Sequence, residues 1–78
     1  MSRAVIEFIA PWLVDNPDEI EIAELEGDGN ASVLELSVHP DDVGKVIGKR
    51  GRMIRSIRTL SKAAGQREGK SYSVEVVD

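Results

Sequence analysis

Apolar residues recur at helical spacing near the start of the chain, at Val5, Phe8, Ile9, Trp12 and Leu13. This spacing predicts a helix over residues 3–14, with Ser2 as a suitable N-cap. Pro11 lies inside this helix, where its missing backbone donor can introduce a kink. Residues 15–18, Asp-Asn-Pro-Asp, are typical of a turn and end the helix.

Two stretches with alternating apolar residues follow. In residues 19–26 the apolar phase shifts between Ile22 and Leu25, which indicates a bulge or an early end to regular strand pairing. Residues 27–30, Gly-Asp-Gly-Asn, are a strong turn signal. The next stretch alternates as a half-buried strand does, with one face formed by Leu34, Leu36 and Val38. The two stretches therefore predict a β-hairpin.

A second helix is predicted to start at residues 39–42, His-Pro-Asp-Asp, and to run to about Ile47. Pro40 is acceptable in the first turn of a helix, and His39 is a typical residue at a helix start. We interpret Asp41 and Asp42 as carboxylates that lie near the positive end of the helix dipole, not as an acid/base pair.

A third helix is predicted after residues 48–51, with one apolar face formed by Ile54, Ile57, Leu60 and Ala64. Gly65 is a natural stop for this helix, so residues 66–70 are expected to form a loop. A final strand follows, in which Tyr72, Val74 and Val76 share a face. The order α-β-β-α-α-β predicts an α+β fold, and we expect residues 1–78 to form one domain.

Composition excludes several classes of protein. The chain has 41% hydrophobic and 31% charged residues, as ordinary globular proteins do. It has no cysteine and one histidine, so we expect no disulfide, no metal site and no cofactor. The apolar residues 5–14 are too few to cross a bilayer and include Glu7, which indicates a cytoplasmic protein without membrane contact.

Charge is strongly segregated along the chain. The net charge is -4, but residues 1–42 carry -10, residues 43–67 carry +8 without any acidic residue, and residues 68–78 carry -2. Because salt screens charge beyond roughly 8 Å at physiological ionic strength, an anionic ligand at residues 43–67 would sense that segment more than the average. The acidic composition therefore does not exclude a nucleic-acid partner.

The basic segment contains the tetrapeptide Gly48-Lys49-Arg50-Gly51, which we call the glycine loop. Glycines at its ends let the backbone turn sharply and let a sugar-phosphate chain approach closely. Backbone N–H groups at the start of the following helix, together with the helix dipole, favour an anion there. The side chains of Lys49 and Arg50 add positive charge at the tip.

The alternative interpretation of this segment is a nucleotide-binding P-loop. The spacing of its glycines does not match the P-loop motif. Three residues separate Gly44 from Gly48 where four are required, and Arg50 occupies the position of the magnesium-binding Ser or Thr. We therefore expect no NTPase, no catalytic residue and no enzymatic activity.

The glycine loop, with Met53-Ile54-Arg55-Ser56-Ile57 after it, resembles the GXXG loop of KH domains, which clamps about four nucleotides. Over the whole chain the order of elements is similar to that of type II KH domains, which implies a three-stranded sheet packed on one side by three helices. The small size and the residues around the predicted turns at 13–17 and 39–42 are similar to the KhpA family of small bacterial single-KH proteins.

This resemblance implies where RNA would be bound. It assigns phosphate contacts to Gly48, Lys49, Arg50 and Gly51, and a groove wall to Val43, Gly44, Ile47 and Ile54. The remaining candidates for RNA contact are basic: Lys45, Arg52, Arg55 and Arg58. The opposite wall would be the sheet edge around residues 73–75, and the short connection 65–70 would correspond to the variable loop.

The resemblance also implies partners and a role. The expected partners are single-stranded RNA, a second copy of the chain in a homodimer, and a larger KH-containing protein of the Jag or EloR type. The implied role is that of an RNA chaperone or post-transcriptional regulator, linked to cell division, envelope growth and cell shape. A rival interpretation keeps the protein as an interaction module, in which the same surface serves dimerisation and RNA is bound elsewhere or not at all.

Several side chains have a structural interpretation beside the functional one. Phe8, Trp12 and Tyr72 could stack on bases, but their spacing favours packing in the core. The third helix has a basic face formed by Arg52, Arg55, Arg58 and Lys62. This face could be only a solvated surface or could pair with the acidic half of the chain. A structural role is favoured for Lys62 and Arg67.

Overall fold

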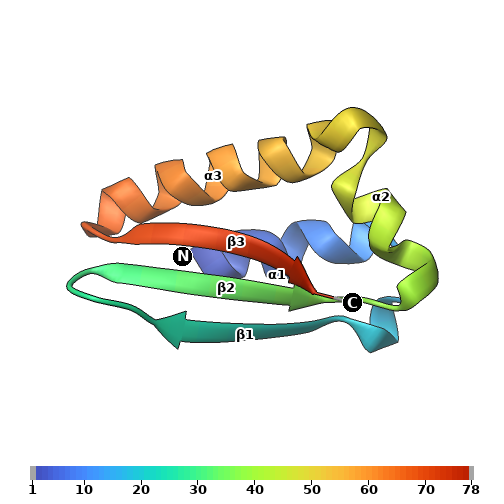
Figure 1. Ribbon diagram of the computed structural model, residues 1–78, viewed down its shortest axis with the longest axis horizontal. Helices are drawn as coiled ribbons and strands as arrows, with labels where there is room; N and C mark the ends of the chain where they lie inside the picture. Colours follow the sequence, from blue (N-terminus) through green and yellow to red (C-terminus); the bar gives the residue numbers. More distant parts are fainter. Residues whose placement is uncertain (1, 78) are drawn as a thin grey trace.

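The computed structural model describes residues 2–77, and within them the predicted order of helices and strands is confirmed (Figure 1). The elements are α1 (Ser2–Leu13), β1 (Glu21–Glu26), β2 (Ala31–Ser37), α2 (Val43–Ile47), α3 (Arg52–Glu68) and β3 (Ser71–Val77). Short 3-10 turns precede β1, α2 and α3, at Pro17–Glu19, Pro40–Asp42 and Lys49–Gly51. The result is an α+β fold with a sheet on one side and helices on the other.

The sheet has the strand order β1-β2-β3, with an antiparallel hairpin of β1 and β2 and a parallel pair of β2 and β3. The predicted bulge in β1 is wrong, because its register is regular from the Glu21–Ser37 pair to the Glu26–Ser32 pair. The shift of phase has another cause. Ile22 packs against the core, whereas Leu25 lies on the opposite face of this edge strand and is exposed.

The core lies between the sheet and the helices. Its buried apolar residues are Ile6, Ala10, Val14, Leu34, Leu36, Val38, Val46, Ile54, Ile57 and Val74. The predicted packing of Phe8 and Trp12 is wrong, because these side chains are 73% and 81% exposed. Phe8 lies about 200° around the helix from Ile6, so both cannot face the sheet. Tyr72 packs against the core, as predicted.

Helix α3 extends further than the sequence predicts. It runs through Gly65 to Glu68 and ends at Gly69, whose φ of 71° is left-handed. Gly65 is buried instead of ending the helix, because a Cβ there would lie 2.7 Å from the Lys70 carbonyl oxygen and 2.7 Å from the Tyr72 ring. The expected loop 66–70 is therefore wrong, and Gly69 and Lys70 alone join α3 to β3.

The apolar face of α3 also differs from the prediction. Ile54 and Ile57 are buried, as predicted. Leu60 is 48% exposed, and the next residue, Ser61, is buried instead. The buried face therefore turns toward Ser61 and Gly65, where small side chains allow close approach to β3.

Candidate functional site

The glycine loop forms the 3-10 turn between α2 and α3, and three of its residues adopt positive φ. Gly48, Arg50 and Gly51 have φ values of 79°, 57° and 73°. The two glycines serve different purposes. A Cβ on Gly48 would lie 2.5 Å from the Met53 Cβ, whereas a Cβ on Gly51 would meet nothing within 4 Å. Gly48 is thus required by close packing and by its dihedral angle, and Gly51 by its dihedral angle alone.

Hydrogen bonds within the loop hold it in place. The Gly51 N–H donates to the Gly48 carbonyl oxygen at 3.1 Å, and the Arg52 N–H donates to that of Lys49. Arg55 Nη2 donates to the Arg50 carbonyl oxygen at 2.7 Å. The expectation that amides at the start of α3 point at a ligand is therefore wrong for those of Gly51 and Arg52, which bond within the loop.

The tip of the loop presents uncompensated positive charge. The side chains of Lys49, Arg50 and Arg52 are exposed, and within residues 2–77 none of them forms an ion pair. Their charge is therefore available to an anion. The arrangement suits a phosphate, since lysine and arginine side chains can reach it without first breaking an internal salt bridge.

Lys45 differs from the other basic candidates because it is paired. Its Nζ donates to Asp15 Oδ2 and lies 3.5 Å from Asp42 Oδ1. The hydrogen bond to Asp15, with the charges of both carboxylates, raises the pKa of Lys45 against the opposing effect of desolvation. Its positive charge is thus offset inside the protein, in contrast to the charges at the loop tip.

Asp42 lies at the N-terminal end of α2, where the sequence predicts it, but its side chain has a further role that the sequence does not predict. Its side chain is 0% exposed and accepts hydrogen bonds from the Asp15 N–H, the Asn16 N–H and Asn16 Nδ2 at 3.2, 3.0 and 3.0 Å. Burial alone would raise the pKa of Asp42, but these donors and Lys45 lower it below its ordinary value. Asp42 therefore ties the chain after α1 to the start of α2, directly before the glycine loop.

The neighbouring residues at the start of α2 behave as predicted. His39 is the N-cap of the 3-10 turn, where its Nδ1 accepts a hydrogen bond from the Asp41 N–H at 3.0 Å. Asp41 is exposed, unlike Asp42. Nothing in the sequence alone distinguishes the two aspartates, because the partners of Asp42 lie 26 and 27 residues away.

The apolar wall candidates have unequal access to a ligand. Val43 and Ile47 are half-buried and pack against the core, and Gly44 is exposed with open space around it. Ile54 is only 5% exposed and belongs to the core. Ile54 therefore supports the helices from below and offers little surface to a ligand.

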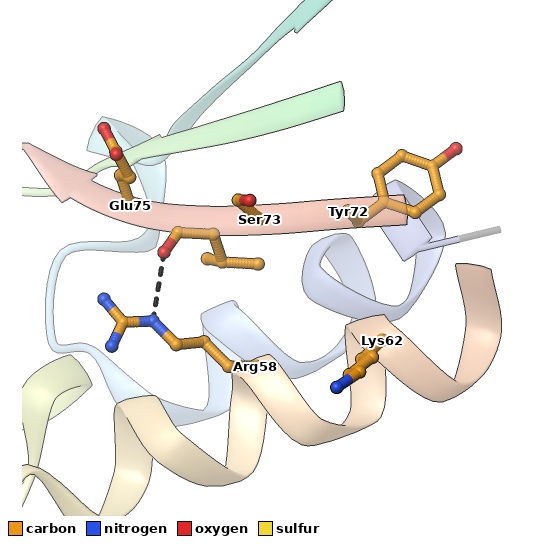
Figure 2. A pocket seen from close by; sticks show the side chains of 6 residues that line it. Arg58, Lys62, Tyr72, Ser73 and Glu75 are labelled. Atoms are coloured by element: carbon orange, nitrogen blue, oxygen red, sulfur yellow. Dashed lines mark hydrogen bonds between the residues drawn. The ribbon is translucent and has the colours of Figure 1, made fainter. Parts of the chain in front are cut away.

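A cleft of about 320 Å³ lies between α3 and β3, and we call it the α3–β3 cleft. It is lined by Arg58, Lys62, Tyr72, Ser73, Val74 and Glu75, as Figure 2 shows from close by. Arg58 crosses it, with Nε donating to the Val74 carbonyl oxygen at 3.2 Å. The resemblance places Arg58 near the exit of the groove and residues 73–75 on its opposite wall, and in the structure Arg58 and these strand residues line the same cleft.

Lys62 was missed as a candidate, since a structural role was favoured for it. It lies four residues after Arg58 in α3 and lines the same cleft. The i,i+4 spacing of Arg58 and Lys62 was a usable signal, because it places both side chains on one helix face. The contribution of Tyr72 could not be read from the sequence, since it depends on how α3 packs against β3.

The sequence profile of a family described as "KhpA/KhpB, KH domain" matches residues 3–76 of the chain. The chain is also similar to curated proteins named "RNA-binding protein KhpA". It is 47% identical to the one from Clostridium acetobutylicum over 75 residues, which cover 96% of this chain and 99% of that protein. Identity to the one from Caldanaerobacter subterraneus is 48% over 73 residues, covering 94% and 96% of the two chains.

A more distant similarity spans the full chain. The Streptomyces coelicolor protein of the same name is 41% identical over 78 residues, which cover 100% of this chain and 94% of that protein.

Within the described residues, no helix has the length and apolar character needed to cross a membrane.

Proposed function

The chain belongs to the KhpA/KhpB family of KH domains, and from this premise we propose that it binds single-stranded RNA without catalysing a reaction. In this proposal the glycine loop grips the phosphate backbone, and the bases lie along the groove between α2, α3 and the edge of β3. The relatives named above as RNA-binding proteins support the ligand class. The single observation that supports the site is the charge of Lys49 and Arg50, which form no ion pair among residues 2–77, on a loop held by internal hydrogen bonds.

The proposed contacts follow the resemblance, with a different role for three residues. Gly48, Lys49, Arg50, Gly51 and Arg52 would contact phosphates, and Val43, Gly44 and Ile47 would face the bases. Lys45 and Ile54 would act less directly, because Lys45 is paired with Asp15 and Ile54 is buried. Arg55 would hold the loop through the Arg50 carbonyl oxygen, in addition to adding charge.

Titration of a short fluorescent RNA at several salt concentrations tests the proposal. If two to four phosphates are neutralised, the slope of log affinity against log salt is about -1.4 to -2.8, from about -0.7 per phosphate on single strands. For one domain, the expected dissociation constant is on the order of micromolar or weaker. A slope near zero would contradict a phosphate clamp.

A charge-reversed loop sharpens the test. The double variant Lys49→Asp and Arg50→Asp should bind the RNA at least about tenfold more weakly. The fold should survive, because both side chains are exposed and aspartate tolerates the left-handed conformation of Arg50. The matched control is Arg67→Glu with Lys70→Glu, which changes the net charge equally at the far end of α3. Equal losses in both variants would show that only overall charge matters.

A second candidate function, dimerisation, is favoured by the exposed apolar side chains. Phe8 and Trp12 on α1 and Leu60 on α3 are exposed on two helices that pack against each other. We propose that they contribute to a homodimer. Light scattering should give the mass of a dimer for the wild type and of a monomer for Phe8→Gln with Trp12→Gln. A monomeric wild type at high concentration would exclude this proposal, and RNA binding by the monomeric variant would separate the two functions.

The cellular role is proposed on the same premise. We propose that residues 1–78 work as one domain in the cytoplasm, as an RNA chaperone or post-transcriptional regulator with a larger Jag-type or EloR-type KH protein as a second partner. Crosslinking in cells tests the RNA role and the protein partner. Bound RNA is identified by sequencing, and bound proteins are identified by mass spectrometry. Recovery of neither partner above the level seen with the charge-reversed loop would contradict this role.

A further inference from the structure

Strand β3 forms a free edge of the sheet beside α3. It is the last strand in the order β1-β2-β3, so in the described part of the chain one side of its backbone has no strand beside it. The N–H and C=O of one residue point to the same side of a strand, and successive residues alternate. The Ser71 N–H donates to the Asn30 carbonyl oxygen beside β2, at 3.1 Å. Tyr72, Val74 and Val76 therefore direct their backbone groups to the free edge, into the α3–β3 cleft.

Arg58 forms a hydrogen bond with the Val74 carbonyl oxygen, the middle acceptor on this edge. Its Nε donates to the Val74 carbonyl oxygen, and within residues 2–77 the guanidinium has no other partner (Figure 2). One nitrogen is thus fixed by the strand, while the two terminal nitrogens remain available with their N–H donors in one plane. A base in the cleft meets this fixed pair of donors, and Arg58 already uses one of the two lone pairs of the Val74 carbonyl oxygen.

A fixed pair of donors distinguishes the four bases. Guanine presents two neighbouring acceptors, O6 and N7, to which arginine binds in bidentate fashion. Cytosine presents O2 and N3 as neighbouring acceptors on its Watson–Crick edge. In adenine the amino group lies beside both N1 and N7, and in uracil N3–H lies between O2 and O4, so acceptors alternate with donors. Single-stranded bases are open to reading on both edges.

The rest of the cleft is compatible with one base. Its volume of about 320 Å³ is at the small end of the range for ligand pockets, roughly 300 to 1,000 Å³. Lys62 lies one helical turn beyond Arg58 and can reach the phosphate next to the bound base. Glu75 lines the cleft as well and can accept from the amino group of a base, which guanine, cytosine and adenine carry and uracil lacks.

We infer that Arg58, held against the edge of β3, determines base specificity by favouring guanine or cytosine over adenine or uracil in the α3–β3 cleft. This inference rests on the proposed RNA binding. The inference adds a base preference to the proposed RNA binding. Phosphate contacts cannot provide such a preference, since phosphates are common to all sequences.

The probe is a set of four oligouridine octamers that differ only in one central base, which is A, C, G or U. Fluorescence anisotropy should show that the wild type binds the G or C octamer about 5- to 150-fold more tightly than the A and U octamers. Arg58→Lys keeps the charge but loses the bidentate geometry. This variant should bind all four octamers with similar affinity, close to that of the wild type for the U octamer.

The matched control is Arg67→Lys in the last turn of the same helix, outside the cleft, which should leave the preference unchanged. Thermal unfolding of each variant checks that α3 still packs against β3. An equal affinity of the wild type for all four octamers, or a full preference in folded Arg58→Lys, overturns the role of Arg58 while RNA binding stands. Failure of every octamer to bind overturns the proposed function itself.

Discussion

At the scale of single residues, the position of the glycine loop depends on the buried carboxylate of Asp42. Three donors from residues 15 and 16 converge on it, and Lys45 lies 3.5 Å away. A buried charge of this kind is tolerated only because its hydrogen bonds are satisfied. The link joins segments that are far apart in the sequence, so α2 cannot shift relative to the end of α1 without breaking it.

Substituting Asp42 should lower stability far more than substituting its neighbour. Asp42→Asn places an amide donor opposite the backbone donors of Asp15 and Asn16, so the melting temperature should fall markedly. Asn16→Ala removes one bond to a charged acceptor, which costs about 1.5 to 3 kcal/mol. Asp41→Asn is the matched control, because its exposed side chain should change stability by less than about 0.5 kcal/mol. Equal melting temperatures for Asp41→Asn and Asp42→Asn would contradict the buried link.

The contribution of Asp42 should also depend on pH. Because its pKa is lower in the folded protein than the ordinary value of 3.8, the unfolded chain binds more protons in acid. The stabilising effect is therefore fully present above pH 3.8 and is lost as the pH falls through the lower, folded-state pKa. Thermal unfolding should show that the wild type loses its advantage over Asp42→Asn below that pH. A constant difference down to pH 2 would argue against the lowered pKa.

At the scale of elements, the end of α3 is set by contact with β3 and not by the first glycine in the helix. Gly65 lies against the Lys70 carbonyl oxygen and the Tyr72 ring, and the helix continues to Gly69. The sequence predicted the existence and order of the elements, because periodicity is a local property. It placed this boundary wrongly, because glycine is both a helix stop and a small residue for close packing.

Two glycine-to-alanine substitutions should have opposite effects. Gly65→Ala should destabilise the protein by about 1 to 3 kcal/mol, the usual cost of inserting a methyl group where there is no room. Gly44→Ala in α2 meets nothing within 4 Å and should stabilise the protein by about 0.5 to 1 kcal/mol through helix propensity. Chemical denaturation of both variants measures the difference. Stabilisation by Gly65→Ala would indicate that β3 can move away from α3.

At the scale of the whole molecule, the sequence predicted the layers but not which side of α1 faces the sheet. Two apolar faces were available, and the helical spacing of Phe8 and Trp12 was the more conspicuous. The structure buries Ile6 and Ala10 instead. Smaller side chains let α1 approach both the sheet and α3 closely. Which face of α1 is buried therefore depends on tertiary packing, and the periodicity of one helix does not predict it.

The candidate site shows the same division between local and distant information. The glycine loop was readable from four consecutive residues. The burial of Asp42, the pairing of Lys45 with Asp15, and the bond from Arg58 to Val74 join residues that are 16 to 30 positions apart. None of these has a signature in the spacing of residues along the chain.

The single tryptophan reports on the exposed face of α1. Because Trp12 is 81% exposed, iodide should quench its fluorescence nearly as well in the dilute native protein as in the unfolded chain. Quenching should weaken as concentration increases if the proposed homodimer covers this face. Strong protection at the lowest measurable concentration would contradict the exposure of Trp12 in the monomer.

The unequal packing around Gly48 and Gly51 has a consequence for mutational tolerance. The two positions share one letter in the loop motif, yet only Gly48 lies against Met53. A saturation library selected for folding should therefore reject nearly every substitution at Gly48, while Asn and Asp persist at Gly51 because they tolerate the left-handed conformation. The same library selected for RNA binding would then report on ligand contact at Gly51 alone, since losses at Gly48 reflect the fold.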